Sequence, residues 1–173
     1  MNYAEIKIND IANGPGVRVS LFVSGCPHHC KGCFNEMTWD YEYGEPFTED
    51  TIEQIIQALS PSYVQGLTLL GGEPMVQQNQ KGLLPLLRKV KEHYPDKNIW
   101  CFTGYVYETD IRDMMMKEWE ETKEFMSYID VLVDGPFVES LKDWSLHFRG
   151  SSNQRLINVS DTLKSGDVVE VNI

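Results

Sequence analysis

Short apolar runs alternate with amphipathic stretches along most of the chain. The apolar runs predict strands at 17–23, 66–70, 99–102 and 128–133, and the β-branched residues of 17–23 indicate that this strand is largely buried. Between them, apolar side chains recur at helical spacing, which predicts helices around 51–59, around 83–90 and within 110–126. Four strand-then-helix units in succession predict an α/β fold with a mostly parallel sheet and right-handed crossovers.

The carboxyl-terminal part of the pattern is less regular. Residues 156–159 read as a further strand, and the turn-like run 164–167 precedes the alternating segment VVEVNI. These last residues are expected to pair with the preceding strand in a terminal hairpin.

Composition and charge narrow the class of protein. The 173 residues are 42% hydrophobic and 24% charged, and no apolar run approaches the ~18 residues that span a bilayer. The amino-terminal ten residues lack an apolar stretch of signal-peptide length, so we expect a single-domain cytoplasmic protein with no membrane partner. A net charge of −11 opposes nonspecific binding to nucleic acid, because such binding needs cations that neutralise phosphates.

Three cysteines are crowded into one loop directly after the first predicted strand. Cys26, Cys30 and Cys33 lie within eight residues, whereas Cys101 stands alone inside a predicted strand and is expected to pack as a small hydrophobe. A zinc site would need a fourth ligand, which His28 or His29 could supply at an awkward spacing. Three free thiols are a further alternative. Three thiolates suit an iron-sulfur cluster better, since one iron of a four-iron cluster then stays open.

Three more short motifs follow predicted strands. They are Gly71-Gly72-Glu73-Pro74, Thr103-Gly104-Tyr105 and Asp134-Gly135-Pro136-Phe137. Because the carboxyl ends of parallel strands gather the sites of α/β folds, these motifs and the cysteine loop should meet on one face.

The C-x3-C-x2-C spacing after the first strand, followed by GGEP after the second, resembles the radical S-adenosylmethionine (radical SAM) superfamily. The resemblance implies a [4Fe-4S] cluster bound by Cys26, Cys30 and Cys33. The open iron would chelate the amino and carboxylate groups of S-adenosylmethionine. Reductive cleavage of the sulfonium would then give methionine and a 5'-deoxyadenosyl radical, so no side chain is expected to act as a catalytic acid or base.

The same resemblance implies the contacts to S-adenosylmethionine. The backbone of Gly32, Cys33 and Phe34 would lie along the adenine, and Gly71, Gly72 and Glu73 would meet the methionine ammonium. Thr103, Tyr105 and Asp134 complete the expected set. Gly32 stands where the superfamily often has an aromatic residue, so adenine stacking would come from Phe34 or Tyr105.

Further segments resemble the activating components of anaerobic ribonucleoside-triphosphate reductases. These are NGPGVR at 13–18, CPHHCKGCFN, TGY, VLVDGPF and FRGSSNQ at 148–154. The resemblance implies an oxidoreductase that abstracts a hydrogen atom from a glycine near the carboxyl end of the reductase's large subunit, with reduced flavodoxin or a similar donor supplying electrons. An activase of another glycyl-radical enzyme, such as pyruvate formate-lyase, and a non-catalytic zinc-binding module are the alternatives.

Chain length adds an expectation about architecture. A complete eight-unit barrel takes about 250 residues, so this chain should form an incomplete, open TIM-like β/α barrel over 1–157. Residues 158–173 would be a carboxyl-terminal extension of the same domain. An open barrel leaves room for a partner protein to complete the site. Arg18 is expected on a solvated face or at the cofactor or partner, and 149–154 at the partner surface.

Overall fold

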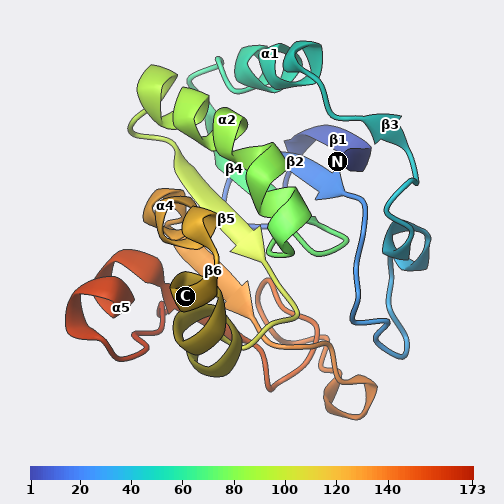
Figure 1. Cartoon of the computed structure of the whole chain (residues 1–173), viewed down its shortest axis with the longest axis vertical. Helices are drawn as coiled ribbons and strands as arrows, with labels where there is room; N and C mark the ends of the chain where they lie inside the picture. The colour runs from blue at the N-terminus through green and yellow to red at the C-terminus, as the bar shows by residue number, and fades with distance from the viewer.

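A single seven-stranded sheet organises the protein, whose computed structural model describes residues 1–173 (Figure 1). Its strand order is β3-β1-β2-β4-β5-β6-β7. The strands are β1 (Asn2–Asp10), β2 (Val17–Val23), β3 (Glu45–Pro46), β4 (Val64–Gly71), β5 (Asn98–Phe102), β6 (Val131–Asp134) and β7 (Arg155–Asn158).

The four predicted strands form the parallel centre of this sheet. β2, β4, β5 and β6 pair in parallel, whereas β1 and β7 pair antiparallel with the outer members of this group, and β3 pairs antiparallel with β1. The two edges do not meet, so the sheet stays open. The predicted fold class, an incomplete barrel with a mostly parallel sheet, is confirmed.

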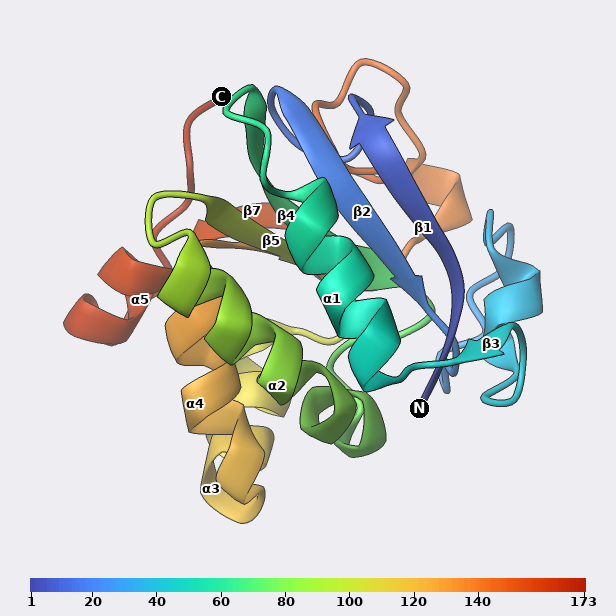
Figure 2. The ribbon, with the colours of Figure 1, turned by 90° about the horizontal axis from the view of Figure 1, so that it is seen from above.

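Helices cover one face of the sheet. They are α1 (Glu49–Ala58), α2 (Gln77–His93), the π-helical η2 (Tyr107–Met115), α3 (Met116–Glu118), α4 (Glu120–Tyr128) and α5 (Val159–Ser165). Two 3-10 turns, η1 (Glu36–Trp39) and η3 (Glu139–Leu141), lie in the loops after β2 and after β6. Figure 2 shows α1, α2 and α4 beside one another on this face. None of the helices is both long and apolar enough to cross a membrane.

Local sequence explains where α1 begins and what it buries. The Thr48 hydroxyl accepts from the Thr51 amide, and the Thr51 hydroxyl accepts from the Thr48 amide, which makes a reciprocal capping box. Ile52, Ile55 and Ile56 then fall on the buried side at helical spacing. The same helix-facing core contains Cys101, which is fully buried as predicted.

Arg18 lies on the opposite, inner face of the sheet and corrects the expectation of a solvated or ligand-facing side chain. It is fully buried, and its guanidinium donates to the Thr68 hydroxyl at 2.7 Å and to the Leu67 carbonyl at 3.0 Å. It also lies 5.6 Å from the centre of the Trp100 ring. Burial lowers the pKa of Arg18 to about 10. Arg18 therefore fills the interior of the partial barrel and satisfies strand carbonyls.

The ends of the chain differ from the sequence-based expectation. The pattern at 2–10 was not predicted as a strand, because its apolar positions are few, yet β1 extends the sheet through nine residues. After β7 the chain forms α5 and then returns to pair antiparallel with β7, as expected, with a helix in place of a simple turn in the connection. The returning segment still reaches β7, where the Val171 amide donates to the Leu156 carbonyl at 2.8 Å. The fourth predicted unit also lacks a long helix, since a loop follows β6.

Candidate functional site

A cavity opens at the carboxyl ends of the parallel strands. Its lining comes from all four strand-end motifs and from the loop before β7, so these segments do converge as the sequence indicates. The residues that line it are Cys26, His28, Cys30, Cys33, Phe34, Asn35, Trp39, Leu70, Gly71, Gly72, Glu73, Phe102, Thr103, Gly104, Val133, Gly135, Phe137, Arg149, Gly150 and Gln154.

All three cysteines of the loop line this cavity. Backbone bonds fix the start of the loop, since the Gly25 amide donates to the Thr38 carbonyl at 2.7 Å and the Cys26 amide to the Trp39 carbonyl at 3.2 Å. All three thiols are partly buried and none is in a disulfide. Burial raises the pKa of the Cys26 thiol to about 11, so without a metal this thiol stays protonated at neutral pH.

The arrangement of possible ligands fits a cluster better than a single zinc ion. No three His, Cys, Asp or Glu side chains converge closely enough to share one ion, and structural zinc needs four. His28 is hydrogen-bonded to Glu73, and His29 stacks on Trp39 with ring centres 4.3 Å apart. A four-iron cluster takes each thiolate on a different iron, so three cysteines that line one cavity without converging on one point suit it.

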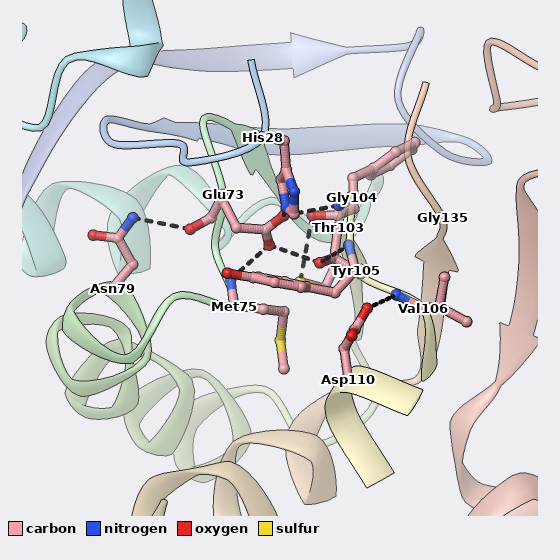
Figure 3. A network of polar contacts seen from close by, with 12 residues as sticks. His28, Glu73, Met75, Asn79, Thr103, Gly104, Tyr105, Val106, Asp110 and Gly135 are labelled. Atoms are coloured by element: carbon pink, nitrogen blue, oxygen red, sulfur yellow. Dashed lines mark hydrogen bonds and ion pairs between the residues drawn. The ribbon is translucent and has the colours of Figure 1, made fainter. Parts of the chain in front are cut away.

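Glu73 is the most heavily bonded side chain at the site. It is 1% exposed, and Figure 3 shows its carboxylate surrounded by donors from three segments. One oxygen accepts from the Thr103 hydroxyl at 2.7 Å and from the Met75 amide at 2.9 Å. The other accepts from the Gly104 amide at 2.8 Å and meets His28 Nε2 at 2.7 Å. The carboxylate thus joins the cysteine loop to the ends of β4 and β5.

The glycines of this motif allow protein segments to approach one another. A Cβ on Gly72 would lie 2.6 Å from the Gly25 carbonyl oxygen, so a side chain here would push the cysteine loop away. Asn79, at the start of α2, ties the same two segments by donating to the carbonyls of Ser24 and Glu73, both at 3.0 Å. Sequence reasoning missed Asn79, since a polar residue in a helix carries no signal of its contacts.

Gly104 is needed for a similar reason. A Cβ at this position would lie 2.6 Å from the His28 ring, which packs edge-on against Tyr105 with ring centres 4.4 Å apart. Tyr105 itself does not line the cavity, and burial raises the pKa of its hydroxyl to about 12. The TGY motif therefore holds His28 against Glu73, a role for His28 that its sequence position did not suggest.

The remaining expected contact residues are only partly brought together. Phe34 lines the cavity and is 65% exposed, so its ring stands at the mouth. Gly32 faces the 137–139 segment and is not part of the lining. Asp134 is also outside the lining, because its carboxylate turns away to Arg155 and to the amide of Tyr107. Its neighbour Gly135 lines the cavity in its place.

Asp134 belongs to an ion-pair network below the site. Arg155 Nε donates to Asp134 at 3.0 Å, and its two terminal nitrogens donate to the two Glu108 oxygens at 2.8 and 2.7 Å. This bidentate pair lowers the pKa of Glu108 to about 2. Because Asp134 is 1% exposed, its carboxylate carries a desolvation cost, and the ion pair with Arg155 offsets that cost.

We expect Arg155→Met to lower the free energy of unfolding by about 2–3 kcal/mol, because it leaves the Asp134 carboxylate buried and unpaired. The folded-state pKa of Glu108 lies below its usual 4.5, so its stabilisation is present above pH 4.5 and is lost as pH falls towards 2. The difference from wild type, measured by urea unfolding, should shrink over that range. Arg112→Met, which removes an exposed pair, is the control and should change stability by no more than about 0.5 kcal/mol.

Arg149 was expected at the partner surface but lines the cavity. It is the one Lys or Arg in the lining, and Glu73 is the one carboxylate. Its Nε is buried without a hydrogen-bond partner, and one terminal nitrogen makes only a 3.4 Å contact with the Gln154 carbonyl. The guanidinium therefore has donors to spare, whereas Glu73 is fully bonded by the protein.

Comparison with known proteins identifies the family. Residues 12–157 match the family described as "4Fe-4S single cluster domain". The chain is 44% identical over 161 residues to the anaerobic ribonucleoside-triphosphate reductase-activating protein of Enterobacteria phage T4, covering 93% of this chain and 96% of the relative. The proteins of the same name from Pasteurella multocida and Escherichia coli K12 are 43% and 44% identical over 156 residues, which cover 89% of this chain and 95% and 96% of those relatives.

These matches span the cysteine loop, the sheet and the cavity, and they agree with the fit of three thiolates to an iron-sulfur cluster. The chain therefore belongs to the family of anaerobic ribonucleoside-triphosphate reductase-activating proteins, radical SAM enzymes that carry a [4Fe-4S] cluster.

Proposed function

We propose that this protein activates the large subunit of an anaerobic ribonucleoside-triphosphate reductase by removing a hydrogen atom from one of its glycines. The observation that carries the proposal is the cavity itself, which is lined by three cysteines without a fourth and by the Glu73 motif. When bound, the cluster supplies one electron that cleaves S-adenosylmethionine to methionine and a 5'-deoxyadenosyl radical, which takes the glycine hydrogen to leave 5'-deoxyadenosine and a glycyl radical.

The chain's own residues bind and orient in this scheme. Cys26, Cys30 and Cys33 hold the cluster, and Gly71 and Gly72 at the end of β4 line the same cavity. Glu73 is the one carboxylate in the cavity lining, so it is the negatively charged side chain available to the ammonium group of S-adenosylmethionine. Because four protein donors already occupy it, the ammonium would replace one of them, and His28 is the donor from a partly exposed loop residue.

Arg149 is the residue we assign to the α-carboxylate of S-adenosylmethionine. The carboxylate is the anionic group of that molecule, and Arg149 is the fixed cation of the cavity with unpaired donors. An unpaired carboxylate in this partly buried site would carry a desolvation cost that the guanidinium offsets.

Arg149→Met should weaken S-adenosylmethionine binding by about 10- to 100-fold, the loss of a charge-assisted hydrogen bond of about 1.5–3 kcal/mol. Isothermal titration of the cluster-loaded protein measures this directly. The decarboxylated analogue is the matched ligand, because wild type and Arg149→Met should bind it with similar affinity. Equal weakening for both ligands would show that Arg149 only supports the loop.

We also propose the source of the electron. Reduced flavodoxin or a similar one-electron donor would reduce the cluster, as the family resemblance implies.

We propose that residues 158–173 are an extension of the same domain. The packing of Val171 against Trp100, Val133 and Leu156 on the inner face of the sheet supports this.

Anaerobic reconstitution with iron and sulfide tests the chemistry. We expect visible cluster absorption and, with a strong reductant, release of methionine and 5'-deoxyadenosine in equal amounts from S-adenosylmethionine. A protein that takes up zinc, shows no cluster absorption and cleaves no S-adenosylmethionine would instead be the binding module.

A further inference from the structure

The mouth of the cavity carries exposed aromatic side chains that the chemistry inside does not explain. Phe34 is 65% exposed and Trp144 is 82% exposed, and Leu141 between them in sequence order is 43% exposed. Isolated exposed apolar residues are common, but a group of them beside a cavity marks an interaction site. Burial of the same rings inside the protein would have been the default, so their position calls for a partner.

The exposed side chains at the mouth of the cavity come from the cysteine loop and from the 137–148 segment, and contacts between the two segments join them into one surface. Lys142 Nζ lies 5.0 Å from the centre of the Phe34 ring and 4.2 Å from that of Trp144, so one ammonium group makes cation–π contacts with both rings. Phe34 also packs on Phe137 with ring centres 5.8 Å apart. The views agree that the 137–148 segment lies beside the cysteine loop (Figures 1 and 2). We call Phe34, Lys142 and Trp144 the rim.

We propose that the rim is the docking surface for the reductase segment that carries the target glycine. This inference rests on the proposed function and adds the place where the protein substrate binds. Phe34 belongs both to the cavity lining and to the rim, so a polypeptide whose glycine enters the cavity has to pass along these rings. Aromatic residues held in place lose little freedom on binding, which makes Trp144 the expected hot spot.

Charge favours this occupant over a second copy of the chain. The chain as a whole carries −11, yet Lys142 lies against the Phe34 ring at the mouth, and the 92% exposed Lys31 lies nearby in an ion pair with the half-exposed Glu139. Two copies of so acidic a chain repel each other, whereas a separate polypeptide can place carboxylates or backbone carbonyls opposite these lysines. Covering the mouth would also keep water from the reacting atoms, which the open sheet cannot do alone.

Trp144→Ala tests the proposal, with Lys142→Ala as a second variant and Tyr63→Ala as the control. Tyr63 is 60% exposed and directly precedes β4, at the amino ends of the parallel strands, whereas the cavity lies at their carboxyl ends. The full-length, cluster-loaded chain is titrated with the purified large subunit. Trp144→Ala should weaken binding at least about tenfold and Lys142→Ala less, while Tyr63→Ala stays within about twofold. Cleavage of S-adenosylmethionine without the reductase should be equal in all four proteins.

Each result has a definite meaning. If wild type forms a glycyl radical on the reductase and Trp144→Ala binds and activates as well as wild type, the rim is not the docking surface. The same holds if Tyr63→Ala weakens binding equally, or if Trp144→Ala changes only the oligomeric state of the isolated chain. Failure of wild type itself to form the glycyl radical would overturn the proposed function, not the rim alone.

Discussion

Replacing Cys26, Cys30 or Cys33 by alanine is expected to abolish both cluster binding and S-adenosylmethionine cleavage. Each thiol lines the cavity, and no other Cys, Asp or Glu side chain combines with them to complete a metal site. A cluster that loses one of three protein ligands has two open corners and is lost to solvent. Iron and sulfide content after anaerobic reconstitution measures the first effect, and release of 5'-deoxyadenosine the second.

Cys101→Ala is the matched control, because it removes the same group from a position away from the cavity. Cys101 is fully buried in the helix-facing core, so its loss should cost about 1 kcal/mol of folding stability and leave iron content unchanged. Loss of the cluster in Cys101→Ala, or retention of full iron content in any of the other three variants, would contradict the ligand assignment.

Glu73→Gln should lower both folding stability and S-adenosylmethionine affinity. The amide replaces one carboxylate oxygen by a donor, which then faces the backbone N–H of either Gly104 or Met75, neither of which can accept. Buried donors without acceptors cost about 1–3 kcal/mol each, so we expect about 3 kcal/mol in total and a melting temperature lower by roughly 6–12 °C. Removal of the negative charge should also weaken binding of the ligand ammonium.

Glu53→Gln is the comparison, since Glu53 is an exposed carboxylate on α1 that pairs with Lys89. It should change the melting temperature by no more than about 2 °C and leave ligand affinity unaltered. An unchanged melting temperature in Glu73→Gln would show that the four hydrogen bonds to this carboxylate are not all formed in solution.

The central part of the fold follows from the alternation of strands and helices in the sequence. Val17–Val23 and the three other predicted strands are short, mostly apolar runs, as expected of parallel strands buried on both faces. The polar residues that interrupt them, such as Arg18 and Thr68, are buried and hydrogen-bonded to each other. β1 has no such run because it is near the edge and half exposed, and β3 has only two residues. The terminal segment pairs antiparallel with β7 as its alternating pattern indicates, but the connection contains α5, capped by Asn158, which the sequence pattern did not predict.

The residues of the site divide in the same way, into those that the local sequence indicates and those that only the folded chain brings together. The three cysteines and the Glu73 motif could be found because spacing within a loop is local. The burial of Arg18 and the turning of Asp134 to Arg155 depend on residues that are tens of positions apart, and only the folded sheet brings them together. Arg149 could be identified as polar and near the partner, but not as the cation of the cavity.

Electron paramagnetic resonance of the reductase after incubation with this protein, S-adenosylmethionine and a strong reductant tests the central claim most directly. We expect a glycyl radical signal on the large subunit, a change in its hyperfine splitting when the subunit is labelled with deuterated glycine, and no signal with Cys30→Ala. Cleavage of S-adenosylmethionine by wild type without any glycyl radical on the reductase would contradict the account.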